Sequence, residues 1–201
     1  AIGSRSQLNA TTGEFNTSLG SDSMGFGVTT GNYNVAIGYK AGEAMTGGGQ
    51  NTLIGVFAGD ALTSGNNNVA LGYEALSTEN AHGNNIAIGF QTLKVQDAGA
   101  DAYNVAIGYA TGKLVTTGVR NTLIGGFAGD ALTTGGNNVA IGYGALSVED
   151  GHSNNVAIGT FSLLNQNAGA DAYNVAVGYG SAQNLTTAVN TTVLGGQAGN
   201  S

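Results

Sequence analysis

The sequence predicts an all-β protein, a parallel β-solenoid built from coils of 17–19 residues. Two observations carry this prediction. A core motif, Asn-x-x-(Ile/Leu/Val)-Gly, recurs along nearly the whole chain, at a period too short for two helices. Within the motif, side chains alternate with the period of two that is typical of strands, and the apolar residues do not follow helical spacing. Residues 1–201 therefore form a single repeat array.

The repeat is regular enough to number each coil from its first residue. The coils open at Asn16, Asn34, Asn51, Asn68, Asn85, Asn104, Asn121, Asn138, Asn155, Asn174 and, with Thr in place of Asn, Thr191. Most are 17 residues apart, but the coils that open at Asn85 and Asn155 have 19. Because Asn34, Asn104 and Asn174 are each 70 residues apart, four coils make a higher-order superrepeat.

Each coil is expected to contain a strand such as residues 34–38, a second extended piece, and a turn such as residues 46–50. The Gly at the fifth position supplies a bend that a Cβ would obstruct. Stacked coils then pair in parallel, about 4.8 Å apart. This register predicts one column along the array, formed by Val35, Thr52, Val69, Ile86, Val105, Thr122, Val139, Val156 and Val175.

Both faces of the predicted strand are apolar, with Val35 and Ile37 on one side and Ala36 on the other. One face of a single solenoid normally meets water, so we expect another chain to cover the Ala face. Small residues permit close approach around a symmetry axis, which predicts a homotrimer. On this view Ile107 lies in a core column, and Ala102 lies in an extended turn that water can reach.

The composition excludes several functions. The chain has 36 Gly and no Pro, Cys or Trp, and it carries a net charge of −7 with only five Lys and Arg. Without Cys there are no disulfides, thiol nucleophiles or thiolate metal sites. The acidic balance argues against nucleic acid, and no apolar run approaches the roughly 20 residues that membrane insertion requires.

Ionisable residues suggest no catalysis. His82 and His152 are 70 residues apart, so their coils should lie four steps, or roughly 19 Å, apart, too far to share a metal. Both are expected on surface turns. Two acidic pairs repeat in the same way, Asp60 with Asp130 and Glu79 with Glu149. A catalytic carboxylate pair would instead need unlike environments a few ångströms apart. We therefore expect no enzyme, no cofactor and no metal.

The repeated polar and aromatic positions suggest structural roles first. Identical amides in successive coils favour a hydrogen-bonded ladder over a sugar site, formed by Asn34, Asn51, Asn68, Asn85, Asn104, Asn121, Asn138, Asn155 and Asn174. A broken aromatic column follows the bend glycine. It indicates either lateral packing or a sugar-stacking strip, made by Tyr39, Tyr73, Phe90, Tyr109, Tyr143 and Tyr179.

The two-residue extensions of the 19-residue coils, within 97–103 and 167–173, are the best candidates for a binding surface. Loops that protrude from a regular scaffold often bind partners. The candidate residues are Asp97, Asp101, Tyr103, Asp171 and Tyr173. The alternative is an insertion that only sets the superrepeat.

The motif Asn-Val-Ala-Ile-Gly-Tyr at residues 34–39 resembles the coils of trimeric autotransporter adhesin heads. It is also similar to Asn-rich Val-Gly-Tyr repeats of tailed-phage fibre proteins, which the longer coils favour. The resemblance implies an extracellular homotrimer, in a virion tail fibre or a cell-surface appendage. We expect a structural shaft or head segment that presents a receptor-binding tip, cut mid-coil at both ends from a longer fibre. The alternative is an adhesin that binds a host-surface glycan or receptor through its lateral surface and extended loops.

Overall fold

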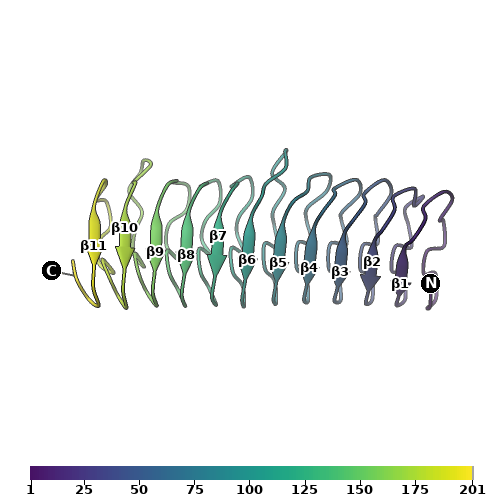
Figure 1. The fold of residues 1–201 in the computed structure, drawn as a ribbon, viewed down its shortest axis with the longest axis horizontal. Helices are drawn as coiled ribbons and strands as arrows, with labels where there is room; N and C mark the ends of the chain where they lie inside the picture. Colours follow the sequence, from purple (N-terminus) through teal and green to yellow (C-terminus); the bar gives the residue numbers. More distant parts are fainter. Residues whose placement is uncertain (201) are drawn as a thin grey trace.

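The computed structural model describes residues 1–200 as a stack of coils with one continuous parallel sheet along its side (Figure 1). Each strand pairs with its neighbours in chain order. The strands are β1 (Thr17–Leu19), β2 (Val35–Ile37), β3 (Thr52–Ile54), β4 (Val69–Leu71), β5 (Ile86–Ile88), β6 (Val105–Ile107), β7 (Thr122–Ile124), β8 (Val139–Ile141), β9 (Val156–Ile158), β10 (Val175–Val177) and β11 (Thr192–Leu194). The predicted parallel β-solenoid is confirmed.

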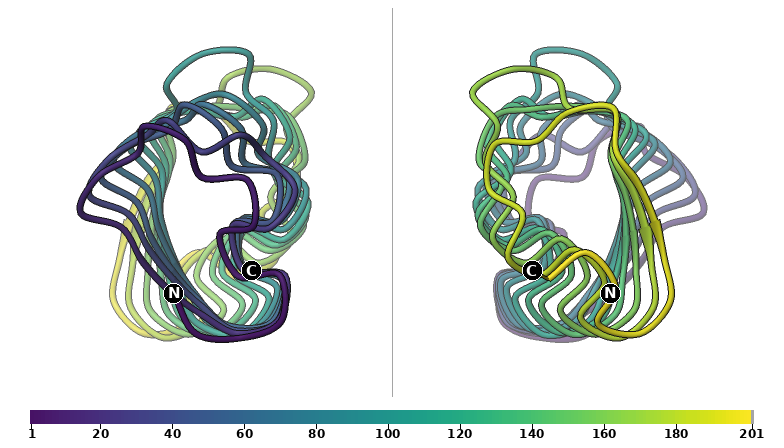
Figure 2. Two further views of the ribbon diagram at one scale, coloured as in Figure 1. Left: turned by 90° about the vertical axis from the view of Figure 1, so that its right-hand side faces the viewer. Right: turned by 90° about the vertical axis from the view of Figure 1, so that its left-hand side faces the viewer.

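The predicted register is also confirmed. Val35 pairs with Thr52, Thr52 with Val69, and the same position continues in every strand to Val175. Viewed along the stack, the coils have similar outlines that shift gradually from one end to the other, and two loops project beyond them (Figure 2). The column of first strand residues is therefore a physical row along the rod.

Each coil has one three-residue strand, and the second extended piece expected from the sequence is not a strand. The strand ends at the bend glycine. Gly38 has φ 131°, and a Cβ there would lie 2.5 Å from the carbonyl oxygen of Gly55 in the next coil. The following turn uses left-handed conformations at Lys40 and Gly42, with φ 59° and 58°. Beyond these turns the chain still bonds to the next coil, as the Thr46 N–H does to the Thr63 carbonyl at 2.9 Å, but these bonds do not form a strand.

The two faces of the strand are oriented opposite to our expectation. Ala36 is fully buried, whereas Val35 and Ile37 on either side of it are only half-buried. In each of the strands β3 to β10, the middle residue is likewise the buried one. The Ala column therefore lines the inside of the solenoid, and another chain does not cover it. The relative exposure of Ala102 and Ile107 is reversed too, because Ala102 is fully buried and Ile107 is 36% exposed.

The narrow interior explains this orientation, because large side chains from the turns already fill it. At the ninth and twelfth coil positions, one residue of each pair is large and apolar. Coils with Gly at position nine have an apolar residue at position twelve, as in the pairs Gly42 and Met45, Gly59 and Leu62, Gly112 and Val115, and Gly129 and Leu132. Coils with Leu at position nine have a polar residue at position twelve, as in Leu76 and Glu79, Leu93 and Gln96, Leu146 and Glu149, and Leu163 and Gln166. Small Ala fits the space that remains.

Residues 1–200 contain no helix of the length and apolarity needed to cross a lipid bilayer.

Candidate functional site

The two extended loops project from the rod after β5 and after β9 (Figure 1). Their tips are Gly99 and Gly169, with φ 71° and 73°, and no described atom lies within 4 Å of a Cβ built at either residue. These are the points where the chain reaches furthest from its own packing. The loops therefore have room for contacts outside the array.

The predicted loop residues are only partly free to make such contacts. Asp101 accepts hydrogen bonds from the Gly83 backbone N–H at 2.8 Å and from the Asn84 side chain at 2.9 Å. Asp171 makes the equivalent bonds in the second superrepeat, to the backbone of Ser153 at 3.0 Å and to Asn154 at 3.3 Å. Both aspartates thus fasten their loops to the preceding coil.

Tyr103 and Tyr173, which close the two loops, lie on the surface with 54% and 56% exposure. Both have φ 54°, a left-handed conformation that is uncommon outside Gly, Asn and Asp. The exposed tyrosine, rather than the anchored aspartate, is the loop residue most available to a partner.

The Asn column is connected by hydrogen bonds through the buried interior. The Asn51 backbone N–H donates to the Asn34 side-chain oxygen at 3.0 Å, and Asn68 and Asn121 repeat this bond with the coils before them. Most of the amides also donate to a turn carbonyl later in their own coil, as Asn51 does to the Gly65 carbonyl at 2.8 Å. Because these side chains are fully buried, the column has a structural role and presents no sugar-binding surface.

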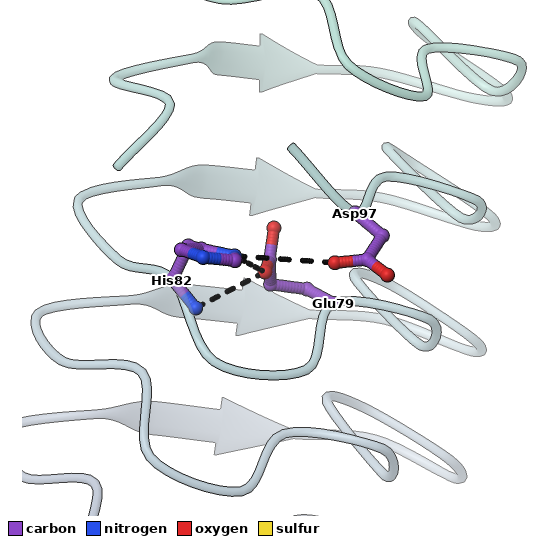
Figure 3. A group of neighbouring side chains, drawn as sticks. All are labelled: Glu79, His82 and Asp97. Atoms are coloured by element: carbon purple, nitrogen blue, oxygen red, sulfur yellow. Dashed lines mark hydrogen bonds and ion pairs between the residues drawn. The ribbon is translucent and has the colours of Figure 1, made fainter. Parts of the chain in front are cut away.

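The two histidines each contact carboxylates, an arrangement that we did not predict. His82 Nδ1 lies 3.2 Å from Glu79 Oε1 and 3.9 Å from Asp97 Oδ1, and Asp97 belongs to the next coil (Figure 3). The Glu79 side chain is fully buried, His82 is 24% exposed and Asp97 is 53% exposed. Buried Glu79 also accepts from Gln96 Nε2 at 3.2 Å. The cluster thus runs from the interior to the surface.

A second cluster stands 70 residues later. His152 Nδ1 lies 2.6 Å from Glu149 Oε1 and 3.9 Å from Asp150 Oδ1. The Glu149 side chain is again fully buried, but its Oε2 has no hydrogen-bond partner among the described residues. The signal in the sequence was a Glu at the twelfth coil position, where five other coils have Met, Leu or Val, followed three residues later by His.

The aromatic column is continuous in the structure, although it looked broken in the sequence. Phe57, Phe127 and Phe161, one position later in their coils, fill the gaps between the tyrosines. Nine rings from Tyr39 to Tyr179 follow one another at centroid distances of 5.1–6.5 Å. Phe90 is stacked between its neighbours at interplanar angles of 12° and 5°, so its faces are covered. This geometry favours lateral packing over sugar stacking.

Asp60 and Asp130, which occupy the same position in successive superrepeats, are both partly buried. Burial raises the pKa of Asp60 to about 6, and the carboxylates of Glu43 and Glu74 add to the rise. Burial also raises the pKa of Asp130, its equivalent in the next superrepeat. In both residues Oδ1 has no hydrogen-bond partner among the described residues. These two carboxyls therefore bind protons at a higher pH than an ordinary aspartate does.

Comparisons with protein-family models, with curated proteins and with solved structures find no match to this chain.

Proposed function

We propose that this chain is a structural segment of an extracellular fibre, such as a phage tail fibre or a similar appendage, which associates as a homotrimer and holds a receptor-binding tip at a distance. The observation that supports this most is the outer face of the sheet. All eleven strands point their first and third residues outward, and every one of these 22 residues is Val, Ile, Leu or Thr. None of them is fully buried.

Parallel sheets in proteins are usually covered on both faces, so an apolar outer face implies a partner. Eleven strands at about 4.8 Å make a stripe about 50 Å long, and three residues at about 3.3 Å make it about 10 Å wide. A pair of such stripes covers about 1,000 Å², the size at which specific interfaces begin. A second copy matches the stripe best, because it has the same coil spacing along its full length.

The trimeric state and the fibre context rest on the resemblance of the repeated Asn-Val-Ala-Ile-Gly-Tyr motif to adhesin heads and phage fibres. A rod of uniform coils also suits a mechanical role, since contacts in a solenoid run only between neighbours and the shape is set by repetition. The alternative, glycan binding through the loops, has support from their open tips. A glycan array probed with the chain would reveal that activity.

Sedimentation velocity tests the self-association. We expect a mass near three times the 19.8 kDa of one chain. The double variant I107D/I141D should sediment as a monomer with an unchanged circular dichroism spectrum, because it places charges in the apolar stripe. The control is T117D, which adds a charge at an exposed turn residue away from the strands. A monomeric wild type, or a double variant that stays trimeric, would overturn the proposal.

A further inference from the structure

We propose that each superrepeat binds one divalent transition-metal ion of the Zn²⁺ type, through Glu79, His82 and Asp97 in the first site and through Glu149, Asp150 and His152 in the second. In each cluster, one imidazole nitrogen and two carboxylate oxygens all lie within 4.8 Å of one another. Imidazole and carboxylate are established ligands of Zn²⁺.

The spacing of the three atoms suits a tetrahedral ion. Ligand bonds of about 2.0–2.1 Å place neighbouring ligand atoms about 3.3 Å apart. In the first site, His82 Nδ1 lies 3.2 Å from the Glu79 oxygen and 3.9 Å from the Asp97 oxygen. Side-chain rotations that shorten the longer separations, including the 3.9 Å one, would bring all three atoms into contact with one ion. A water molecule can complete the site, because Asp97 is half-exposed and the cluster opens to solvent.

Charge balance favours a cation at this place. Glu149 is fully buried, and one of its carboxylate oxygens, Oε2, has no hydrogen-bond partner among the described residues. Burying an unpaired carboxylate is costly. A divalent ion beside two carboxylates and a neutral imidazole gives a neutral cluster. The ion would take the place of the hydrogen bond between His152 Nδ1 and Glu149 Oε1, and a proton on Nδ1 would move to Nε2 of the neutral imidazole or leave to solvent.

Each His has one Asp beside it, but the Asp comes from the next coil in the first superrepeat and from the same coil in the second. The first has Asn80 in the same coil as His82 and Asp97 in the next. The second reverses the pair, with Asp150 in the same coil and Asn167 in the next. In both cases the Asp Oδ1 lies 3.9 Å from the His Nδ1. The two superrepeats thus place an Asp carboxylate at the same distance from the His, although the Asp comes from a different coil in each. This is expected if both sites need a carboxylate to bind the same ion.

Calorimetric titration of the chelator-treated chain with Zn²⁺ tests the proposal. We expect saturation at about two ions per chain, a rise in melting temperature with Zn²⁺, and no comparable response to Mg²⁺, whose preferred ligands are oxygens. H82A and H152A should each bind one ion. The proposal is overturned if the chain binds no Zn²⁺, or if the double His variant binds as wild type does.

An exchange of Asp and Asn provides a sharper test that does not endanger the fold. Because Asp150 is 58% exposed, D150N should fold normally and lose at least tenfold in affinity at the second site. The double variant D150N/N167D rebuilds the arrangement of the first superrepeat and should recover binding of two ions. If D150N binds as wild type does, or if the double variant fails to recover, the Asp is not a ligand and the site as proposed is wrong.

Discussion

Removing one rung of the buried Asn column should destabilise the rod strongly. The Asn121 side chain accepts from the Asn138 backbone N–H at 2.9 Å and donates to the Gly135 carbonyl at 2.9 Å. N121A leaves both backbone groups without a partner in a fully buried place. Each unsatisfied buried group costs about 1–3 kcal/mol, so the variant should lose about 2–6 kcal/mol of unfolding free energy.

The matched control is N16A near the start of the array. Asn16 makes the same two bonds, accepting from the Asn34 N–H at 2.8 Å and donating to the Gly31 carbonyl at 2.7 Å. It is only half-buried, so water can replace its side chain. We expect N16A to lose about 1 kcal/mol or less.

Urea unfolding followed by circular dichroism compares the two variants, and hydrogen exchange locates the damage. In N121A, amides of the coils that contain Asn121 and Asn138 should lose protection first, since solenoid contacts run between neighbours. Equal destabilisation by N121A and N16A would refute the argument that burial makes the column stabilising. Uniform loss of protection along the chain would contradict the local character of the defect.

Two further predictions follow from the exposure of single residues. A102D should lower the melting temperature far more than I107D, because a charge at the fully buried Ala102 costs several kcal/mol, whereas Ile107 faces outward. Equal melting temperatures of the two variants would contradict the strand orientation. The raised folded-state pKa of Asp60, about 6 against an ordinary 3.8, means that its contribution to stability is present below about pH 4 and is lost as pH rises through 6. As the pH is raised from 4 to 7, the melting temperature of D60N should therefore fall less than that of the wild type. If the two melting temperatures change with pH by the same amount, Asp60 does not titrate in this range.

The period, the register and the bend were predictable because they depend on local chemistry. A Gly that must adopt φ 131° against the next coil cannot be replaced easily, so it marks every coil in the sequence. The orientation of the strand was not predictable from alternation alone, because Val35 and Ala36 are both apolar. Which of them faces inward depends on how much space the turns leave, and that is a property of the whole coil.

A signal for the orientation was nevertheless present. Leu53 replaces Ala in the inner column, and Gly occupies the ninth position of its own coil and of the coil before. In the structure a Cβ at Gly42 or at Gly59 would lie 2.9 or 2.8 Å from a Leu53 methyl group. The same compensation recurs at Leu123, beside Gly129. Large and small residues that exchange places in this way must share one space, which identifies the Ala column as internal.

The buried polar residues follow the four-coil superrepeat. In the first superrepeat the Asn104 amide donates to Gln96 Oε1 at 3.0 Å, and Gln96 Nε2 donates to Glu79 Oε2 at 3.2 Å. Gln96 thus satisfies the buried Glu79 and connects it to the Asn column. In the second superrepeat Gln166 keeps the bond to the Asn column, through Asn174 at 3.0 Å, but its Nε2 donates to the Ala188 carbonyl at 3.3 Å and leaves Glu149 Oε2 without a partner among the described residues. Two apolar coils then complete the unit and separate Glu79 from Glu149 by four coils, or about 19 Å. At that distance the two buried carboxyl groups make no direct contact, so each must be satisfied by residues of its own and adjacent coils.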